Sequence, residues 1–175
     1  APMSKFGIGQ AITRREDQRL LTGTGQYLDD MSLPNEVHVA FMRSPHAHAR
    51  IVNVDTSAAK SAPGVVSVFT GAELKIDGVG AFPISPGLVN AVGKPMTSPP
   101  YYPLAVDEVR FVGEAVAAVV ATTRQQALDA VEQVMVTYEV LPAVTTMWQA
   151  LEAQSPRVDE TLPSNLLSHQ HATHG

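Results

Sequence analysis

An uninterrupted run of Ala and Val, residues 115–121, opens the best-defined block of the sequence. A run of this length and composition is typical of a buried strand. Thr123–Gln126 follows it and matches the S/T-x-x-E/Q pattern of a helix N-terminus. The next apolar residues recur at helical spacing and predict one buried stripe: Ala127, Leu128, Val131, Val134 and Met135. Because residues 136–140 again suit a strand, the block predicts a strand–helix–strand unit.

A second strand–helix–strand unit is predicted over residues 49–69. Residues 49–54 carry Ile51, Val52 and Val54, and residues 65–69 are mostly apolar, so both suit strands. Between them, Asp55 is suited to cap a short helix, which Pro63 and Gly64 end. Another strand is expected over residues 37–43. Because strands and helices are interspersed along the chain, we expect an α/β or α+β fold with a mixed sheet.

Residues 71–105 differ from the rest because they are rich in Gly and Pro and poor in charge. We interpret them as a long, mostly irregular arm, since such loops in a compact domain usually contact a partner or carry function. If the arm covers another domain, its large apolar side chains are exposed in the isolated chain. They would promote self-association, or the arm would be disordered. The side chains concerned are Phe82, Ile84, Leu88, Tyr101 and Tyr102.

The length of 175 residues favours one compact domain with extensions. Residues 1–13 are predicted to be a loose lead-in, and residues 14–153 the folded domain. Within that domain, residues 14–22 and 147–153 suit short helices at its two ends. From residue 154 to 175 the chain turns polar and Pro-punctuated, which is typical of a linker toward further domains.

Composition excludes several classes of protein. The net charge is −5 without a basic block, which disfavours nucleic-acid and anionic-membrane binding. Because there is no cysteine, this chain can hold neither disulfides nor thiolate-bound clusters. No apolar run approaches the length of a membrane-spanning helix, and the first residues lack a signal-peptide core. We therefore expect a cytoplasmic protein.

No residue pattern specifies a reaction by itself. Neighbouring carboxylates point to opposite faces of a strand, and the glycine pairs complete no nucleotide-binding motif. Two histidine groups could bind a divalent metal or could equally be polar surface and tail. They are His38, His46 and His48, and His169, His171 and His174. Arg14, Arg15, Arg19 and Arg43 are either locally neutralised surface charges or a docking element.

Four stretches, taken in order, resemble one family. They are RREDQRLLTGTGQYLDDM, FMRSPHAHARIVNVDTSAAKSAPGVVSVFTGAEL, VRFVGEAVAAVVATTRQQALDAVEQVMVTYEVLPAV and LPSNLLSHQHATHG. Together they are similar to the start of the large, molybdopterin-binding subunits of the molybdenum hydroxylases. That family includes xanthine dehydrogenase, aldehyde oxidase and aerobic carbon monoxide dehydrogenase.

The resemblance implies an N-terminal α/β hammerhead domain that packs against the catalytic molybdopterin-binding domains. The complete enzyme would use water to hydroxylate an aldehyde or N-heterocycle, or would oxidise carbon monoxide. Its molybdenum–pterin cofactor would be held by later domains, with iron–sulfur clusters and FAD on other subunits or domains. No catalytic, cofactor-binding or metal-binding residue carries over onto this segment, so the isolated chain should be inactive.

The resemblance does carry over one set of positions onto this sequence, which are candidate interface residues. They are Arg14, Arg15 and Asp17 of the opening motif, Arg43, Ser44, Pro45 and His46 of the R-S-P-H turn, and Gly113 and Glu114. Gly113 would serve a close backbone approach, a positive φ or a β-bulge, and we favour the bulge. The alternative is an independent binding or assembly module of the same fold, with the arm as its recognition loop.

Overall fold

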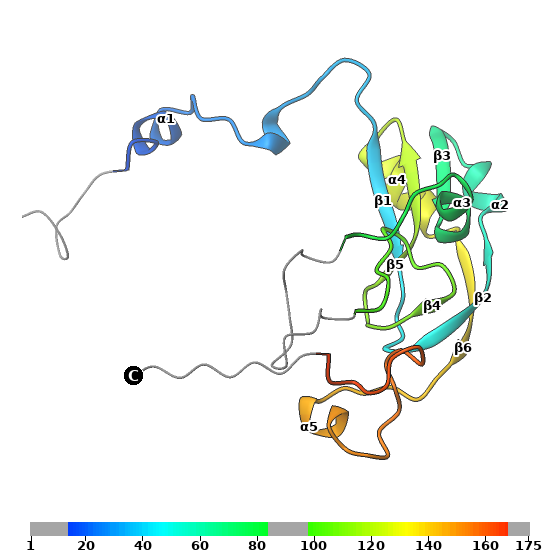
Figure 1. Ribbon diagram of the computed structural model, residues 1–175. Coiled ribbons are helices and arrows are strands. Elements are labelled where there is room, and N and C mark those ends of the chain that lie inside the picture. Colours follow the sequence, from blue (N-terminus) through cyan, green and yellow to red (C-terminus); the bar gives the residue numbers. More distant parts are fainter. Residues whose placement is uncertain (1–13, 84–97, 168–175) are drawn as a thin grey trace, which may run out of the picture. The chain divides into compact units, whose positions relative to one another are not determined.

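A computed structural model describes residues 14–83 and 98–167 of the 175-residue chain (Figure 1). The chain divides into two units, residues 1–36 and residues 37–175. No helix in the described part of the chain is long and apolar enough to cross a membrane. Two arm residues expected to be exposed, Ile84 and Leu88, lie outside the described ranges, as do the histidines of the C-terminal group.

In its described residues, 14–36, the first unit contains one helical turn and one 3₁₀ turn. Helix α1 spans Asp17–Leu21 and the 3₁₀ helix η1 spans Leu28–Asp30. This confirms the helix that was expected over residues 14–22, with narrower bounds. None of the described residues from 14 to 36 is buried. The unit therefore has no core of its own in its described part.

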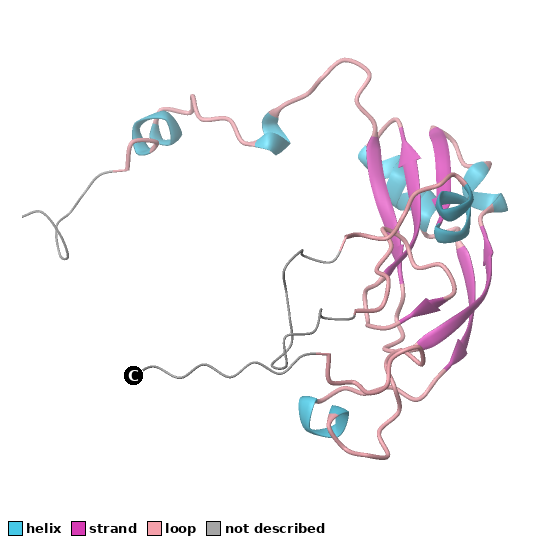
Figure 2. Ribbon diagram, in the orientation of Figure 1, coloured by secondary structure: helices cyan, strands magenta, loops and turns pink. Residues whose placement is uncertain are grey.

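The second unit contains six strands and four helices in its described part (Figure 2). The strands are β1 (His38–Arg43), β2 (Ala49–Asp55), β3 (Val65–Thr70), β4 (Glu108–Val109), β5 (Ala115–Ala121) and β6 (Met135–Val140). The helices are α2 (Ser57–Lys60), α3 (Gly71–Ile76), α4 (Arg124–Val131) and α5 (Met147–Ala150). The run of Ala and Val is β5, with the bounds that the sequence predicts.

The strands form two three-stranded antiparallel sheets, in the orders β1-β5-β3 and β4-β2-β6. The fold class is confirmed, but the expectation of one mixed sheet is wrong. The physical reason is the path of the two strand–helix–strand units. Each unit starts in one sheet and finishes in the other: β2 leads through α2 to β3, and β5 leads through α4 to β6. The helices therefore join sheets and create no parallel pair.

Small side chains let α4 pack closely on the first sheet. Ala127 and Ala130 of α4 are fully buried, and Ala127 lies in one apolar cluster with Ala40 and Ala121 of the sheet. The predicted stripe is wrong in two ways. Leu128 is 45% exposed. The helix ends at Val131, so Val134 and Met135 follow it. Val134 is buried in an apolar cluster with Val68 and Val119, and Met135 is exposed in β6.

The N-terminus of α4 is only half of the predicted capping box. Thr123 accepts a hydrogen bond from the Gln126 backbone N–H, as the motif requires. The Gln126 side chain instead accepts hydrogen bonds from the hydroxyls of Thr122 and Thr123, at 2.7 and 3.0 Å. The pattern thus predicted the start of the helix correctly. The reciprocal hydrogen bond, from the Thr123 N–H to the Gln126 side chain, is replaced by hydrogen bonds from the two hydroxyls.

The arm is less irregular than expected, because its first residues form α3. Thr70 and Glu73 make a complete capping box at this helix. A Cβ atom on Gly71 would lie 2.1 Å from the Ala105 carbonyl oxygen, so only glycine fits where the two ends of the arm meet. Leu104 and Ala105 are buried, whereas Phe82 and Tyr101 are 54% and 51% exposed. The arm is thus anchored at its ends. The predicted exposure is confirmed for Phe82 and Tyr101, whereas Tyr102 is only partly exposed.

Candidate functional site

Two predicted interface motifs, Arg43–His46 and Gly113–Glu114, lie against each other where β1 ends and β5 begins. The Ser44 N–H donates to the Glu114 carbonyl at 2.9 Å, and the Gly113 N–H donates to the Ser44 carbonyl at 2.8 Å. The Arg43 guanidinium donates to the Gly113 carbonyl at 2.8 Å. Residues far apart in the sequence are thereby joined into one junction.

Gly113 occupies a tight turn in this junction. The Glu114 N–H donates to the Phe111 carbonyl at 3.2 Å, and Gly113 has a φ of +89°. No atom lies within 4 Å of a Cβ built on Gly113, so backbone conformation and not close approach requires glycine here. The pairing of β1 with β5 does shift register nearby, but the shift lies between Met42 and Arg43 and not at Gly113, which belongs to the turn before β5. The favoured bulge interpretation of Gly113 itself is therefore wrong.

Glu114 is a buried carboxylate, 7% exposed. Its side chain accepts a hydrogen bond from the Arg110 backbone N–H at 2.5 Å. Burial raises the pKa of the Glu114 carboxyl, and the hydrogen bond and the charge of Arg110 offset part of that rise. The carboxylate thus holds the turn of residues 110–114 from the inside.

The R-S-P-H turn is held by its own serine. Ser44 is buried, and its hydroxyl accepts a hydrogen bond from the His46 N–H at 3.0 Å and donates to the His46 carbonyl at 3.2 Å. The His46 ring meets the Tyr138 ring edge-on, with centroids 5.0 Å apart. Pro45 is exposed. His46 is thus a packing residue of the turn.

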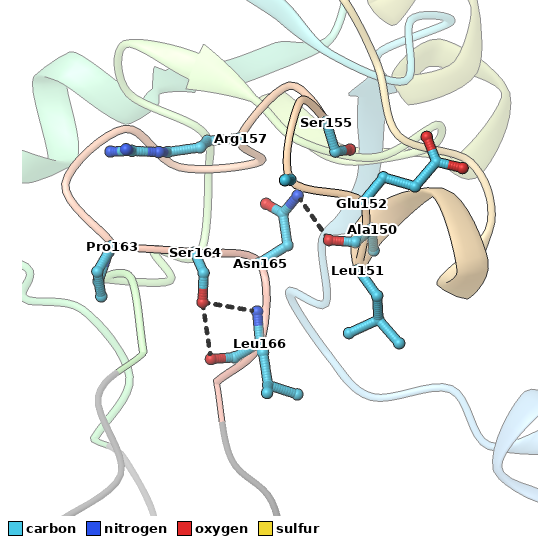
Figure 3. Close-up of a pocket in the computed structure, with 10 residues that line it drawn as sticks. Ala150, Leu151, Glu152, Ser155, Arg157, Pro163, Ser164, Asn165 and Leu166 are labelled. Atoms are coloured by element: carbon cyan, nitrogen blue, oxygen red, sulfur yellow. Dashed lines mark hydrogen bonds between the residues drawn. The ribbon is translucent and has the colours of Figure 1, made fainter.

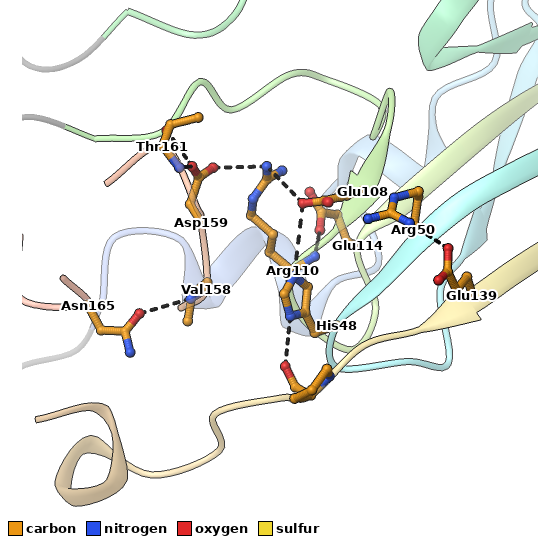
Figure 4. A network of polar contacts seen from close by, with 11 residues as sticks. His48, Arg50, Glu108, Arg110, Glu114, Glu139, Val158, Asp159, Thr161 and Asn165 are labelled. Atoms are coloured by element: carbon orange, nitrogen blue, oxygen red, sulfur yellow. Dashed lines mark hydrogen bonds and ion pairs between the residues drawn. The ribbon is translucent and has the colours of Figure 1, made fainter. Parts of the chain in front are cut away.

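A second polar cluster, absent from the sequence-based expectations, centres on Arg110 and Asp159 (Figure 4). Arg110 Nη2 lies 2.9 Å from Asp159 Oδ2 and 3.4 Å from Glu108 Oε2. Asp159 is only 5% exposed, and it also accepts hydrogen bonds from the backbone N–H and hydroxyl of Thr161. Burial disfavours the charge of Asp159, but Thr161 and Arg110 outweigh it and hold the pKa of this carboxyl below its ordinary value.

His48 borders this cluster and links it to the residues that follow β6. It is buried, its Nδ1 lies 2.9 Å from the Pro142 carbonyl oxygen, and its Nε2 lies 3.9 Å from Glu108 Oε2. Among the described residues, no group of three or more His, Cys, Asp or Glu side chains could hold a metal ion. The first histidine group is therefore not assembled as a metal site. The second lies outside the described residues, and a site there stays a prediction.

The segment that was interpreted as the start of a linker makes specific contacts in its described part. Asn165 accepts a hydrogen bond from the Val158 N–H and donates to the Pro156 carbonyl, both at 2.9 Å. Around it lies a cavity of about 300 Å³ (Figure 3). Side chains of mixed character line the cavity, among them Leu151, Glu152, Arg157, Ser164 and Leu166. With Asp159 buried against Arg110, this segment is tied to the second sheet.

The remaining predicted interface residues belong to the first unit. The Arg14 N–H donates to the Asp17 carboxylate at 3.3 Å, and Arg15 is exposed. These three residues form a local turn at the start of α1. Their role at an interface stays a prediction.

No pattern in the sequence distinguishes Arg110, Asp159 and His48 as members of a site. Arg110 stands among apolar residues, and a charge beside a short strand is common. Asp159 lies in a polar segment where most acidic side chains are solvated. Only the contact across the fold distinguishes these residues from their neighbours, and a single sequence does not contain it.

Comparison with known proteins places the fold among characterised enzymes. A family model described as "Aldehyde oxidase and xanthine dehydrogenase, a/b hammerhead domain" matches residues 22–142. The carbon monoxide dehydrogenase large chain of Afipia carboxidovorans is 40% identical over 160 residues, which are 91% of this chain and 18% of that protein. The nicotine 6-hydroxylase large subunit of Paenarthrobacter nicotinovorans is 38% identical over 167 residues, or 94% and 19%.

Solved structures agree with these sequence relatives. Quinoline 2-oxidoreductase from Pseudomonas putida 86 superposes with a TM-score of 0.77 at 42% identity, over 89% of this chain and 19% of that one. A Cu,Mo-CO dehydrogenase superposes with a TM-score of 0.73 at 37% identity, over 95% and 20%. The chain thus spans about a fifth of the length of the proteins it matches.

Proposed function

Because the chain belongs to the aldehyde oxidase and xanthine dehydrogenase α/β hammerhead family, we propose that it is the N-terminal domain of a molybdenum hydroxylase large subunit. It packs against the catalytic molybdopterin-binding domains and positions them. The observation that carries this proposal is the junction of Arg43–Ser44 with Gly113–Glu114. Two motifs that resemble the family's are joined there by hydrogen bonds to backbone carbonyls. Contacts of this kind suit a structural support and not a reactive site.

The reaction of the complete enzyme is the oxidation of a carbon centre with water. A substrate R–H and water give R–OH, two protons and two electrons, and for carbon monoxide the same balance gives carbon dioxide. The electrons pass to iron–sulfur clusters and FAD on other subunits or domains. The relatives' names include a CO dehydrogenase, a nicotine 6-hydroxylase and a quinoline oxidoreductase. We place the substrate of this enzyme in the same range: an aldehyde, an N-heterocycle or carbon monoxide.

We propose that other segments of the large subunit hold the molybdenum–pterin cofactor. Within residues 14–83 and 98–167, no cluster of candidate metal ligands occurs. The buried carboxylates of Asp159 and Glu114 both contact Arg110, Asp159 through its guanidinium and Glu114 through its backbone N–H. We therefore assign the cofactor to other segments and assign no catalytic step to this one. The complete enzyme is proposed to be cytoplasmic and multi-subunit.

Co-expression tests this assignment. The 175-residue chain would be produced together with the rest of its large subunit as a separate, affinity-tagged polypeptide, and with the iron–sulfur and flavin subunits. We expect the chain to co-purify in equimolar amount with the tagged polypeptide. An assembled, active enzyme that excludes the chain, or a chain that instead binds an unrelated partner, would contradict the proposal and favour an independent binding module.

A further inference from the structure

One face of the first sheet carries apolar side chains that no described element covers completely. In β1, Ala40 is 7% exposed and packs toward α4, as its cluster with Ala127 shows. Successive side chains of a strand point to opposite faces. Val39 and Phe41 therefore lie on the face away from α4, where they are 50% and 45% exposed.

The strand register extends this face across the sheet. Phe41 pairs with Ala118 of β5, which pairs in turn with Phe69 of β3. Val39 pairs with Val120 in the same way. The side chains of directly paired residues share a face. The row Phe41–Ala118–Phe69 is thus apolar across the sheet, whereas the row that starts at Val39 ends at Ser67 of β3. The side chains most exposed on this face are those of the edge strand β1, Val39 and Phe41.

Side-chain contacts continue this face onto the arm. The Arg43 guanidinium carbon lies 5.6 Å from the centre of the Phe41 ring, and the same guanidinium donates to the Gly113 carbonyl. Beside Gly113, the side chains of Val112 and Phe111 are 65% and 45% exposed. Phe111 and Phe82 flank Tyr101, with ring centroids 6.2 and 5.6 Å from it. We name this set the sheet-and-arm surface: Val39, Phe41, Phe82, Tyr101, Phe111 and Val112.

We propose that the sheet-and-arm surface is the site at which the rest of the large subunit docks. This inference rests on the proposed function. Exposed apolar side chains that gather in one place mark interaction surfaces. The surface is preformed, because Arg43 joins the sheet to the turn and the Phe82 N–H donates to the Tyr101 carbonyl at 2.8 Å. A preformed surface binds with little ordering cost.

The occupant follows from how much of the relatives this chain covers. It matches 18% to 20% of their length, so about four-fifths of a large subunit lies outside it. A neighbour in the same polypeptide is always present at high effective concentration, which a second copy of the chain is not. The aromatic side chains of the surface are also of the kind that anchors protein interfaces.

Glutamine variants at matched exposure test the surface. The double variant Phe41→Gln, Phe111→Gln removes two aromatic anchors. The control is Leu128→Gln, because Leu128 is as exposed as Phe41 but lies on α4, which packs on the other face of the sheet. Each chain is mixed with the tagged remainder of the large subunit, and affinity is measured. We expect the control to bind like the unaltered chain and the double variant to bind at least about tenfold more weakly.

The outcomes separate the surface from the function. Circular dichroism and thermal unfolding of the double variant should match those of the control, which excludes misfolding as the cause of weaker binding. If the unaltered chain does not bind the remainder, the proposed function fails and this inference with it. If both variants bind equally well, only the inference is overturned. If the double variant loses self-association but still binds the remainder, a second copy occupies the surface, which also overturns it.

Discussion

Asp159 shows how one buried carboxylate can fix the path of a chain segment. Its ion pair with Arg110 Nη2 at 2.9 Å ties the segment after α5 to the residue that follows β4. Replacing it by asparagine leaves Arg110 without its buried counter-charge. We expect Asp159→Asn to lower the free energy of unfolding by about 2 kcal/mol, as for other charge-assisted hydrogen bonds. Chemical denaturation of the two chains measures this difference.

The matched control is Asp107→Asn. Asp107 lies 3.9 Å from Lys75 Nζ, but its side chain is 83% exposed. Exposed ion pairs contribute little, so the free energy of unfolding should change by less than about 0.5 kcal/mol. Equal effects of the two substitutions would contradict the role assigned to Asp159.

The effect of Asp159 should also depend on pH in a defined direction. The pKa of its carboxyl is lowered in the folded chain from an ordinary value of 3.8. The unfolded chain therefore takes up a proton first as the pH falls. The stabilisation is complete above the ordinary pKa and is lost as the pH falls through the lowered pKa. We expect the difference in unfolding free energy between the unaltered chain and Asp159→Asn to be constant near neutrality and to shrink below pH 3.8. Urea titrations at a series of pH values test this, and a difference that grows on acidification would contradict it.

Gly113 tests whether the turn at the junction is built on backbone conformation. Its φ of +89° is a region that residues with a Cβ rarely adopt, and space around it is open. We expect Gly113→Ala to lower the free energy of unfolding by about 1–2 kcal/mol. Gly80→Ala is the control, since Gly80 also has open space but no positive φ. A change near zero at Gly113 would show that the turn adapts without strain.

At this scale the sequence indicated one half of the candidate site. Arg43, Ser44, Gly113 and Glu114 stand in motifs whose resemblance to a family singled them out. Arg110 and Asp159 could not be found in the same way, because their role depends on the ion pair between them, in which the Asp159 carboxylate is buried. Burial depends on packing between segments that are separate in the sequence.

Secondary-structure elements were predictable where a local pattern alone decides them. β5 is recognisable because seven consecutive Ala and Val residues suit a strand buried on both faces. α4 begins at its predicted cap but ends early, because the stripe that was counted through Met135 continues into β6. α3 was overlooked because Gly71 at its first position and the Gly-rich residues after it resemble a loop. Its capping box, Thr70 and Glu73, was the signal that could have revealed it.

The packing of α3 against Leu104 and Ala105, at the other end of the arm, can be tested at Gly71. A Cβ there would lie 2.1 Å from the Ala105 carbonyl oxygen and 2.8 Å from that of Leu104. Both are backbone atoms, so the helix and the end of the arm must separate. We expect Gly71→Ala to lower the free energy of unfolding by about 2 kcal/mol or more, and amide hydrogen exchange near Ala105 to accelerate. Alanine has a higher helix propensity than glycine, and this difference partly offsets the expected loss. A variant more stable than the unaltered chain would contradict the close approach at Gly71.

For the molecule as a whole, the two sheets explain why a small domain can serve as a support. Each strand–helix–strand unit crosses from one sheet to the other, so the sheets are linked twice through helices. The sheet pairing was not predictable from one sequence, because period and propensity identify strands but not their partners. What the composition did indicate is the exposed apolar surface on the arm, at Phe82 and Tyr101.

The central claim is that this chain supplies support while other segments hold the redox centre. Molybdenum analysis tests it most directly, on the purified 175-residue chain and on its complex with the rest of the large subunit, both from molybdate-supplied cells. We expect no stoichiometric molybdenum in the chain alone and about one metal per complex, retained when His46 and His48 are both changed to Ala. Stoichiometric molybdenum bound to the chain by itself would contradict the account.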